Sequence, residues 1–198
     1  MQLKQKLFGR GKIFHPTRNI SPYFKQFNQI ENKKIINIGS GGYRPIKNAI
    51  NIDPYRQADI KAFGENLPFT DNSIDLAICV GVLEHVKKPL DIVNEIKRVL
   101  KPNGLIYIEV PFLQPFHAAP NDYYRWTENG ILELCKDFKK IDCGVATSSG
   151  SSLAWIILEF FSSRISRALV KIILWPLKYI KKNNLKIASG IYFYGSKK

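Results

Sequence analysis

The stretch IINIGSGG at residues 35–42, followed by INID at residues 50–53, decides how this sequence folds. Each stretch contains a short run rich in β-branched residues, which is typical of a buried parallel strand. The first run ends in a glycine turn, where the backbone can approach a ligand because no Cβ intrudes. The second ends in Asp53, whose carboxylate can accept hydrogen bonds from ribose hydroxyls. Since open α/β sheets bind ligands at the carboxyl ends of their strands, the pair predicts a nucleoside cofactor; an ordinary glycine loop is the alternative.

The following residues continue the alternation of strands and helices. An apolar strand is predicted over 76–80 and another over 105–111. Between them, residues 89–100 are predicted to form a helix that Lys101–Gly104 ends, since Pro and Gly commonly follow a helix. The apolar face of this helix is predicted to carry Leu90, Val93, Ile96, Val99 and Leu100. Toward the amino terminus, Phe24, Phe27 and Ile30 have helical spacing and predict a helix that covers the sheet.

With these motifs, the chain resembles the class I S-adenosylmethionine-dependent methyltransferases. Leu-Pro-Phe at 67–69, Asp-Asn-Ser-Ile-Asp at 71–75 and Leu-Glu-His at 83–85 have the order and spacing found in a group of small members. The resemblance covers about residues 33–142 and a last strand near the carboxyl terminus. It implies an α/β fold: a doubly wound, mostly parallel seven-stranded sheet of the Rossmann-like methyltransferase type. Strands six and seven are expected at 141–145 and 187–194, with a helical insertion between them.

The resemblance implies S-adenosylmethionine as the cofactor and indicates which residues bind it. The glycine turn would pass under the methionine and ribose, and Asp53 would hold the ribose hydroxyls. Asn37 stands where relatives usually have an acidic residue, but it can still bind the cofactor's amino group. Phe63 stands where relatives often have Asp, so backbone contacts and stacking would hold the adenine. The full expected set is Asn37, Gly39, Ser40, Gly41, Asp53, Gly64, Glu65, Asn66, Leu67, Val80 and Gly81.

Glu84-His85 follows the strand at 76–80, near the expected position of the transferred methyl group. Histidine is the natural general base near neutral pH, so His85 is a catalytic candidate; capping the following turn is the alternative. Some relatives bind a divalent ion through this region and have a second Glu where this chain has Gly81. That difference leaves too few ligands, and we expect no metal.

Residues 111–127 follow the next strand and are unusually rich in polar and aromatic side chains. A similar pattern occurs in methyltransferases of bacterial surface-polysaccharide and glycolipid pathways. By this resemblance His117, Asp122, Tyr123 and Arg125 join His85 as candidates for acceptor binding and catalysis. Alternatively, Asp122 and Arg125 pair with each other to hold the loop. Thr127 is expected to cap a helix that starts after it.

Length and composition agree with a single methyltransferase domain over residues 1–198. The 45% hydrophobic and 23% charged residues exclude disorder and an integral membrane protein by composition. Cys79, Cys135 and Cys143 lack zinc-site spacing and predict reduced structural thiols. Residues 1–10 lack the apolar core of a secretory signal. A cytoplasmic location is therefore expected.

The net charge of +14 is unevenly distributed along the chain. Residues 1–34 hold eight basic residues and one acidic residue, and residues 151–198 hold nine and one. Residues 35–150 hold thirteen basic and fourteen acidic residues, so the core is almost neutral. A nucleic-acid enzyme would carry its basic residues around the site, so a nucleic-acid partner is not expected. An anionic membrane surface is a more natural partner for basic flanks.

Two flanking segments stand out, a basic helical lead at residues 1–32 and a basic, aromatic insertion at residues 150–184. Charges interrupt every apolar run of the insertion before the ~18–20 residues that a membrane span requires. Its composition suits a helix lying in a membrane interface, at the inner face of the cell membrane, or a lid over the substrate site.

Three functions compete on this reading. The first is a methyltransferase that acts on a sugar hydroxyl or other polar group of a cell-envelope glycan or lipid-linked intermediate. The second is a soluble small-molecule methyltransferase whose hydrophobic insertion is a lid. The third is a non-enzymatic binding module that kept the fold, which Asn37 and Phe63 make conceivable. The sequence does not name the acceptor.

Overall fold

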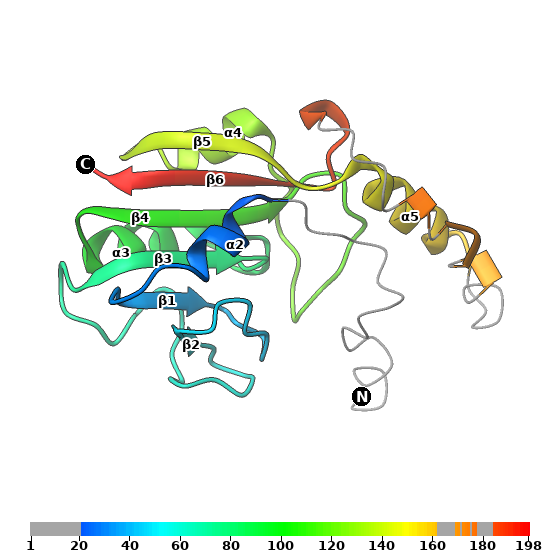
Figure 1. Ribbon diagram of the computed structural model, residues 1–198. Coiled ribbons are helices and arrows are strands. Elements are labelled where there is room, and N and C mark those ends of the chain that lie inside the picture. Colours follow the sequence, from blue (N-terminus) through cyan, green and yellow to red (C-terminus); the bar gives the residue numbers. More distant parts are fainter. Residues whose placement is uncertain (1–20, 162–168, 171, 175, 178–183) are drawn as a thin grey trace.

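The computed structural model describes residues 21–161, 169–170, 172–174, 176–177 and 184–198 (Figure 1). Its centre is a six-stranded sheet in the order β2-β1-β3-β4-β6-β5. The strands are β1 Ile35–Ile38, β2 Ala49–Ile52, β3 Ile74–Val80, β4 Leu100–Pro111, β5 Phe138–Thr147 and β6 Gly190–Lys197. The helices are α2 Tyr23–Phe27, α3 Pro89–Val99, α4 Glu128–Leu134 and α5 Ser149–Glu159, with 3₁₀ turns η1 Leu83–His85 and η3 Leu185–Ile187.

The sheet is mixed and has six strands among the described residues, so the expectation of seven was wrong. Strands β2, β1, β3 and β4 are parallel, whereas β6 runs antiparallel to both β4 and β5. Beyond β2, the part of the chain that the structure describes adds an isolated parallel bridge between Ile52 and Ile60. The Asp59 carboxylate accepts the Asn51 backbone N–H at 2.8 Å and also pairs with Arg44. A side chain therefore takes up an edge donor of β2 that a further strand would need.

Helix α3 and the start of β4 refine the sequence prediction. The helix buries Pro89, Ile92, Val93, Ile96 and Val99, whereas Leu90 is 50% exposed, so its place on the buried face was wrong. Because Ile92 and Ile96 lie one turn apart, they direct this face to the sheet. Residues 101–104 do not form a separate connection, because the strand already begins at Leu100. Its register against β3 shifts between the pairs Ile74–Leu100 and Leu76–Leu105, so these residues form a bulge within β4.

Two apolar clusters cover the two faces of the sheet. One contains the buried face of α3 together with Ile131 of α4. The other lies under α2, where Phe27 is 1% exposed and packs edge-on against Tyr107 with ring centroids 5.2 Å apart. The helix predicted from Phe24, Phe27 and Ile30 is thus confirmed as a short helix over the sheet, although it ends at Phe27 and does not include Ile30. Figure 1 shows α2 and α3 on opposite faces.

The carboxyl-terminal part forms the closing antiparallel hairpin that the resemblance implied. The insertion separates β5 from β6, and its described beginning is α5, which extends away from the sheet in Figure 1. Residues 1–20 of the basic lead and residues 162–168, 171, 175 and 178–183 of the insertion lie outside the described residues. Within the described part of the chain, no helix has the length and apolar character needed to cross a membrane.

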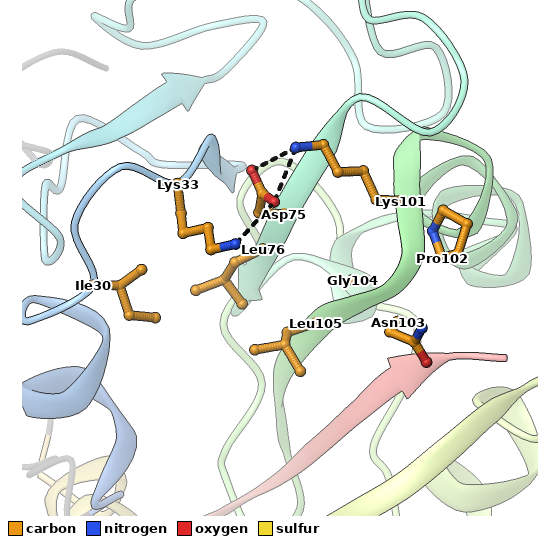
Figure 2. Close-up of a pocket in the computed structure, with 9 residues that line it drawn as sticks. All are labelled: Ile30, Lys33, Asp75, Leu76, Lys101, Pro102, Asn103, Gly104 and Leu105. Atoms are coloured by element: carbon orange, nitrogen blue, oxygen red, sulfur yellow. Dashed lines mark hydrogen bonds and ion pairs between the residues drawn. The ribbon is translucent and has the colours of Figure 1, made fainter.

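A hollow of about 620 Å³ lies at the amino-terminal ends of β3 and β4, and Figure 2 shows residues that line it. Asp75 at its wall is held by Lys101 at 3.0 Å and Lys33 at 3.7 Å. The glycine turn and the histidines lie at the opposite, carboxyl ends of the strands. We therefore do not assign the functional site to this hollow.

Candidate functional site

The glycine turn after β1 has the backbone conformation that its sequence suggested. Gly39, Gly41 and Gly42 have φ angles of +63°, +56° and +79°, in the left-handed region that favours glycine. A Cβ at Gly39 would lie 2.3 Å from Cγ2 of Val82, whereas a Cβ at Gly41 would meet nothing within 4 Å. Gly39 thus lets the turn pack against the segment after β3, and Gly41 lines open space.

Asp53, just after β2, holds this turn in place. Its carboxylate accepts the Gly41 N–H at 2.7 Å through Oδ2, and the Tyr55 and Arg56 N–H groups at 2.8 and 2.6 Å through Oδ1. The residue is only 6% exposed. Since each carboxylate oxygen can accept two hydrogen bonds, Oδ2 retains one acceptor position. The position predicted for a ribose contact is therefore also a structural support of the turn.

Asn37 and Ser40 lie beside the turn and are buried. The Asn37 amide donates to the Tyr43 carbonyl at 3.2 Å and to the Asn51 side-chain oxygen at 2.9 Å. Ser40 has a buried hydroxyl without a hydrogen-bond partner among the described residues. Buried polar groups are usually paired, so this hydroxyl is a place where a bound molecule could supply the partner.

The segment predicted to border adenine divides into buried and exposed residues. Gly64 is buried against Ile38 and Ile92, and Leu67 is 2% exposed, so the Leu67 side chain belongs to the core. Glu65 and Asn66 between them are exposed. Nearby, Phe63 is 53% exposed and packs edge-on against Tyr55, which is 68% exposed. These two rings offer an aromatic surface beside the Asp53 loop.

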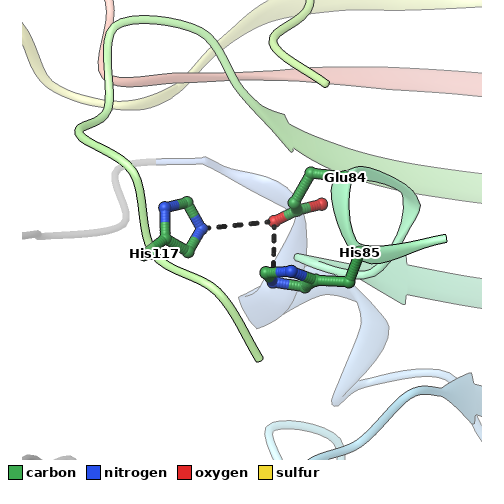
Figure 3. Close-up of side chains that lie close together, drawn as sticks. All are labelled: Glu84, His85 and His117. Carbon is green, nitrogen blue, oxygen red and sulfur yellow. Dashed lines mark ion pairs between the residues drawn. The ribbon is translucent and has the colours of Figure 1, made fainter. Parts of the chain in front are cut away.

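A polar cluster of Glu84, His85 and His117 lies beyond the end of β3 (Figure 3). Oε1 of Glu84 is 3.6 Å from Nε2 of His85 and 3.7 Å from Nε2 of His117. Glu84 is 2% exposed, and its Oε2 has no partner among the described residues. Neighbouring Val80 and Gly81 connect β3 to this cluster. A Cβ at Gly81, where φ is +65°, would lie 3.6 Å from Oε1 of Glu84.

The neighbouring carboxylate affects the protonation of His117. Burial of the ring disfavours its charged form, but Glu84 and the Pro115 carbonyl favour that form and together outweigh burial. The pKa of His117 is therefore raised above its ordinary value. The cluster is a place where positive charge is favoured.

The loop after β4 places His117 through a network of its own residues. Asp122 and Arg125 form a two-pronged ion pair at 2.5 and 2.6 Å, and Asp122 also accepts the His117 backbone N–H at 2.8 Å. Arg125 further donates to the carbonyls of Gln114 and Pro115. The alternative in which these charges hold the loop is thus present in the structure. Acceptor contact by either residue stays a prediction.

Tyr123 links the loop to the cluster through its backbone and presents its side chain to solvent. Its N–H donates to the Glu84 carbonyl at 2.7 Å, and the residue is 41% exposed. At the end of the loop, the Thr127 hydroxyl accepts the Gly130 N–H at 3.1 Å, which confirms Thr127 as the N-cap of α4. The carboxyl-terminal part of the loop is therefore held at Tyr123 and at the start of α4, while contact of the exposed Tyr123 side chain with an acceptor stays a prediction.

Two contributors to this site were missed in the list of candidates from the sequence. Trp155 of α5 packs on His117 with ring centroids 5.3 Å apart, so the insertion reaches the cluster. Glu84 joins the two histidines, and its position beside His85 was the available signal. The structure also bears on the expectation that the region around Glu84 offers too few metal ligands. His117, distant in sequence, brings a third ligating group to within 4.8 Å of the other two.

The chain is similar in sequence and in fold to known methyltransferases. Residues 43–108 match a methyltransferase domain family. An uncharacterized methyltransferase of Mycobacterium leprae is 39% identical over 64 residues, which are 32% of this chain and 24% of the relative. The match thus spans about a quarter of the relative's length.

Solved structures extend the likeness to the whole fold. A SAM-dependent methyltransferase of Thermotoga maritima has a TM-score of 0.61 at 16% identity, over 100% of this chain and 96% of the other. A phosphoethanolamine N-methyltransferase of Haemonchus contortus, in complex with S-adenosylhomocysteine, has a TM-score of 0.54 at 17% identity, over 87% and 51%. The matched domain and the mycobacterial relative support a class I S-adenosylmethionine-dependent methyltransferase family for this chain, and the solved structures show that it shares their fold.

Proposed function

We propose that this protein transfers a methyl group from S-adenosylmethionine to a polar acceptor. The main support for this proposal is that the Gly39 turn packs directly on Val82, two residues before Glu84. A donor bound over the turn would therefore lie next to the cluster of Glu84, His85 and His117. Methyl transfer requires this proximity, because it displaces the sulfur in line with the attacking atom.

The features of the turn suit this cofactor. Asp53 Oδ2 has an acceptor position for a ribose hydroxyl, and Ser40 has a buried hydroxyl that needs a partner. The open space above Gly41 leaves room for the ligand. Phe63 and Tyr55 offer their exposed rings to the adenine. Their position agrees with stacking in place of the acidic residue that many relatives have.

The protein has little covalent chemistry to perform. When bound, S-adenosylmethionine supplies a methyl group on a sulfonium, which carries its own leaving group. The acceptor atom bonds to the methyl carbon, the carbon–sulfur bond breaks, and its electron pair stays on sulfur. The proton of the acceptor passes to the Glu84 carboxylate, whose Oε2 has no partner among the described residues. His117 and its loop orient the acceptor.

Calorimetry and a transfer assay test this function. S-adenosylmethionine should bind in a one-to-one ratio, and cell extracts should receive its labelled methyl group when the protein is added. Gly41→Val, which fills the space above the turn, should abolish binding. Absence of binding by the wild-type protein would contradict the function. Binding without transfer to any extract would favour the non-enzymatic module.

We further propose that the acceptor is a sugar or other polar group of a cell-envelope glycan or lipid-linked intermediate, methylated at the inner face of the membrane. The polar cluster supports a polar acceptor. Exposed apolar side chains of the insertion support a lipid-linked one; they are Leu153, Ile156, Phe160, Leu169, Ile172 and Ile173. The basic residues of the insertion would meet anionic lipid. The near-neutral core argues against nucleic acid as the acceptor.

The contact of Trp155 with His117 favours a second candidate, a small-molecule methyltransferase in which α5 is a lid. Flotation with vesicles separates the two. For the lipid-linked acceptor, binding should require anionic lipid, because each lysine or arginine near such a surface contributes about 1 kcal/mol. Binding should weaken with salt, because salt screens these charges. Equal binding to neutral vesicles would refute the electrostatic contribution. No binding at all would favour the lid.

A further inference from the structure

The two histidines of the polar cluster have the same hydrogen-bond arrangement. Nδ1 of His85 lies 2.6 Å from the Asn121 carbonyl, and Nδ1 of His117 lies 2.8 Å from the Pro115 carbonyl. A carbonyl oxygen only accepts, so these contacts place a hydrogen on each Nδ1. Arg125 also lies 3.3 Å from Nδ1 of His117, but its Nη2 already donates to Pro115 and Asp122. In the neutral ring, each Nε2 then carries a lone pair.

Both Nε2 lone pairs converge on one buried carboxylate. Oε1 of Glu84 lies 3.6 and 3.7 Å from them, and all three ligating atoms lie within 4.8 Å of one another (Figure 3). Three electron-rich atoms repel each other unless a proton or a metal ion lies between them. The Arg125 guanidinium, 3.3 Å from Nδ1 of His117, is already paired with Asp122. Among the described residues, no lysine or arginine pairs with the buried Glu84 carboxylate, and an unpaired buried charge is costly.

We propose that Glu84, His85 and His117 bind one divalent transition-metal ion. Such an ion lies about 2.0–2.2 Å from nitrogen and oxygen ligands, so it holds them about 3–3.5 Å apart. The Glu84–histidine distances of 3.6 and 3.7 Å are already close to this spacing, and the two histidine nitrogens, within 4.8 Å of each other, would move together on binding the ion. Backbone carbonyls that accept the Nδ1 hydrogens fix the ring orientation, as outer partners do at metal sites. Two imidazoles and one carboxylate suit zinc, manganese or cobalt, whereas magnesium prefers oxygen ligands.

The ion would also act on the methyl acceptor, a role that rests on the proposed function. Three protein ligands leave a coordination position open. An acceptor oxygen bound there would lose its hydroxyl proton more readily, and that proton would pass to Oε2 of Glu84. The oxygen then bonds to the methyl carbon as the carbon–sulfur bond breaks and its electrons remain on sulfur. The Gly39–Val82 contact places this position near the donor turn.

Calorimetric titration of the full chain with zinc tests the site, after treatment with a chelator and dialysis. One ion should bind per chain, and magnesium should bind far more weakly. Glu84→Gln and His117→Ala should each weaken zinc binding by at least roughly 10–100-fold, the cost of losing even an outer partner. His15→Ala is the matched control, since His15 is the third histidine of the chain and is remote in sequence. It should leave the affinity unchanged.

Nuclear magnetic resonance of the histidine rings keeps the test decisive if a variant fails to fold. In the wild-type protein, zinc should shift the Nε2 resonances of His85 and His117 and leave His15 unchanged. No shift at saturating zinc, equal binding of magnesium, or unchanged affinity in both folded variants would overturn the site and favour a protonated histidine as the cation. If a protein that binds no zinc still transfers methyl groups, the metal site is refuted and the proposed function stands. Zinc binding without binding of S-adenosylmethionine would overturn only the proposed function.

Discussion

Asp53→Asn tests whether one carboxylate both supports the glycine turn and binds the cofactor. The carboxylate accepts three backbone N–H groups, and an amide can keep at most the two bonds made through one oxygen. If the amide nitrogen replaces Oδ2, it faces the Gly41 N–H donor to donor. A hydrogen bond to a charged acceptor contributes about 1.5–3 kcal/mol, and the donors belong to the exposed residues Gly41, Tyr55 and Arg56. We expect a loss of about 2 kcal/mol in the free energy of unfolding.

The affinity for S-adenosylmethionine should fall in parallel. The variant loses a charged acceptor for the ribose and distorts the turn, which together should cost about 10–100-fold in affinity, since 1.4 kcal/mol corresponds to tenfold. Urea denaturation measures the stability, and calorimetry measures the affinity. Asp91→Asn removes the same charge from an exposed position on α3 and should change both values little. A folded Asp53→Asn protein with unchanged affinity would refute the ribose assignment, and unchanged stability would refute the support of the turn.

Three further predictions concern other parts of the fold. Gly39→Ala should destabilise the protein by about 1–3 kcal/mol and reduce its affinity for the cofactor, because the new Cβ would collide with Val82 at a left-handed backbone position. A calorimetric titration that matches wild type would refute the close packing. Arg125 lowers the pKa of Asp122 to about 2, so the pair stabilises the fold above about pH 4. About 2 kcal/mol of the free energy of unfolding should be lost as the pH falls toward 2. In acid titrations followed by circular dichroism, Asp122→Asn should flatten that part of the stability curve. Phe27→Ala should cost about 3–5 kcal/mol by thermal or urea unfolding if α2 seals the sheet, and a cost below 1 kcal/mol would show that the helix is dispensable.

The strands and helices of the core were predictable because their signals are local. The run at residues 35–38 is β-branched and followed by glycines, so strand and turn could be read without any partner. Thr127 as an N-cap depends only on residues three positions away. The place of His85 just beyond an apolar strand could also be read from the sequence. These features depend on short-range geometry, which a sequence displays directly.

Features set by distant residues were not predictable in this way. The missing edge strand depends on where the Asp59 side chain meets the backbone of β2, and the exposure of Leu90 depends on how α3 is rotated against the sheet. The meeting of Glu84 with His117 is the clearest example, because the two are more than thirty positions apart. Their contact results from the end of β3 and the loop after β4 lying side by side, with Asp122 and Arg125 holding that loop. The sequence alone thus determined the strands, the turn and the family resemblance. Only the tertiary structure decided that a carboxylate and two imidazoles converge, since convergence depends on chain packing and not on local pattern.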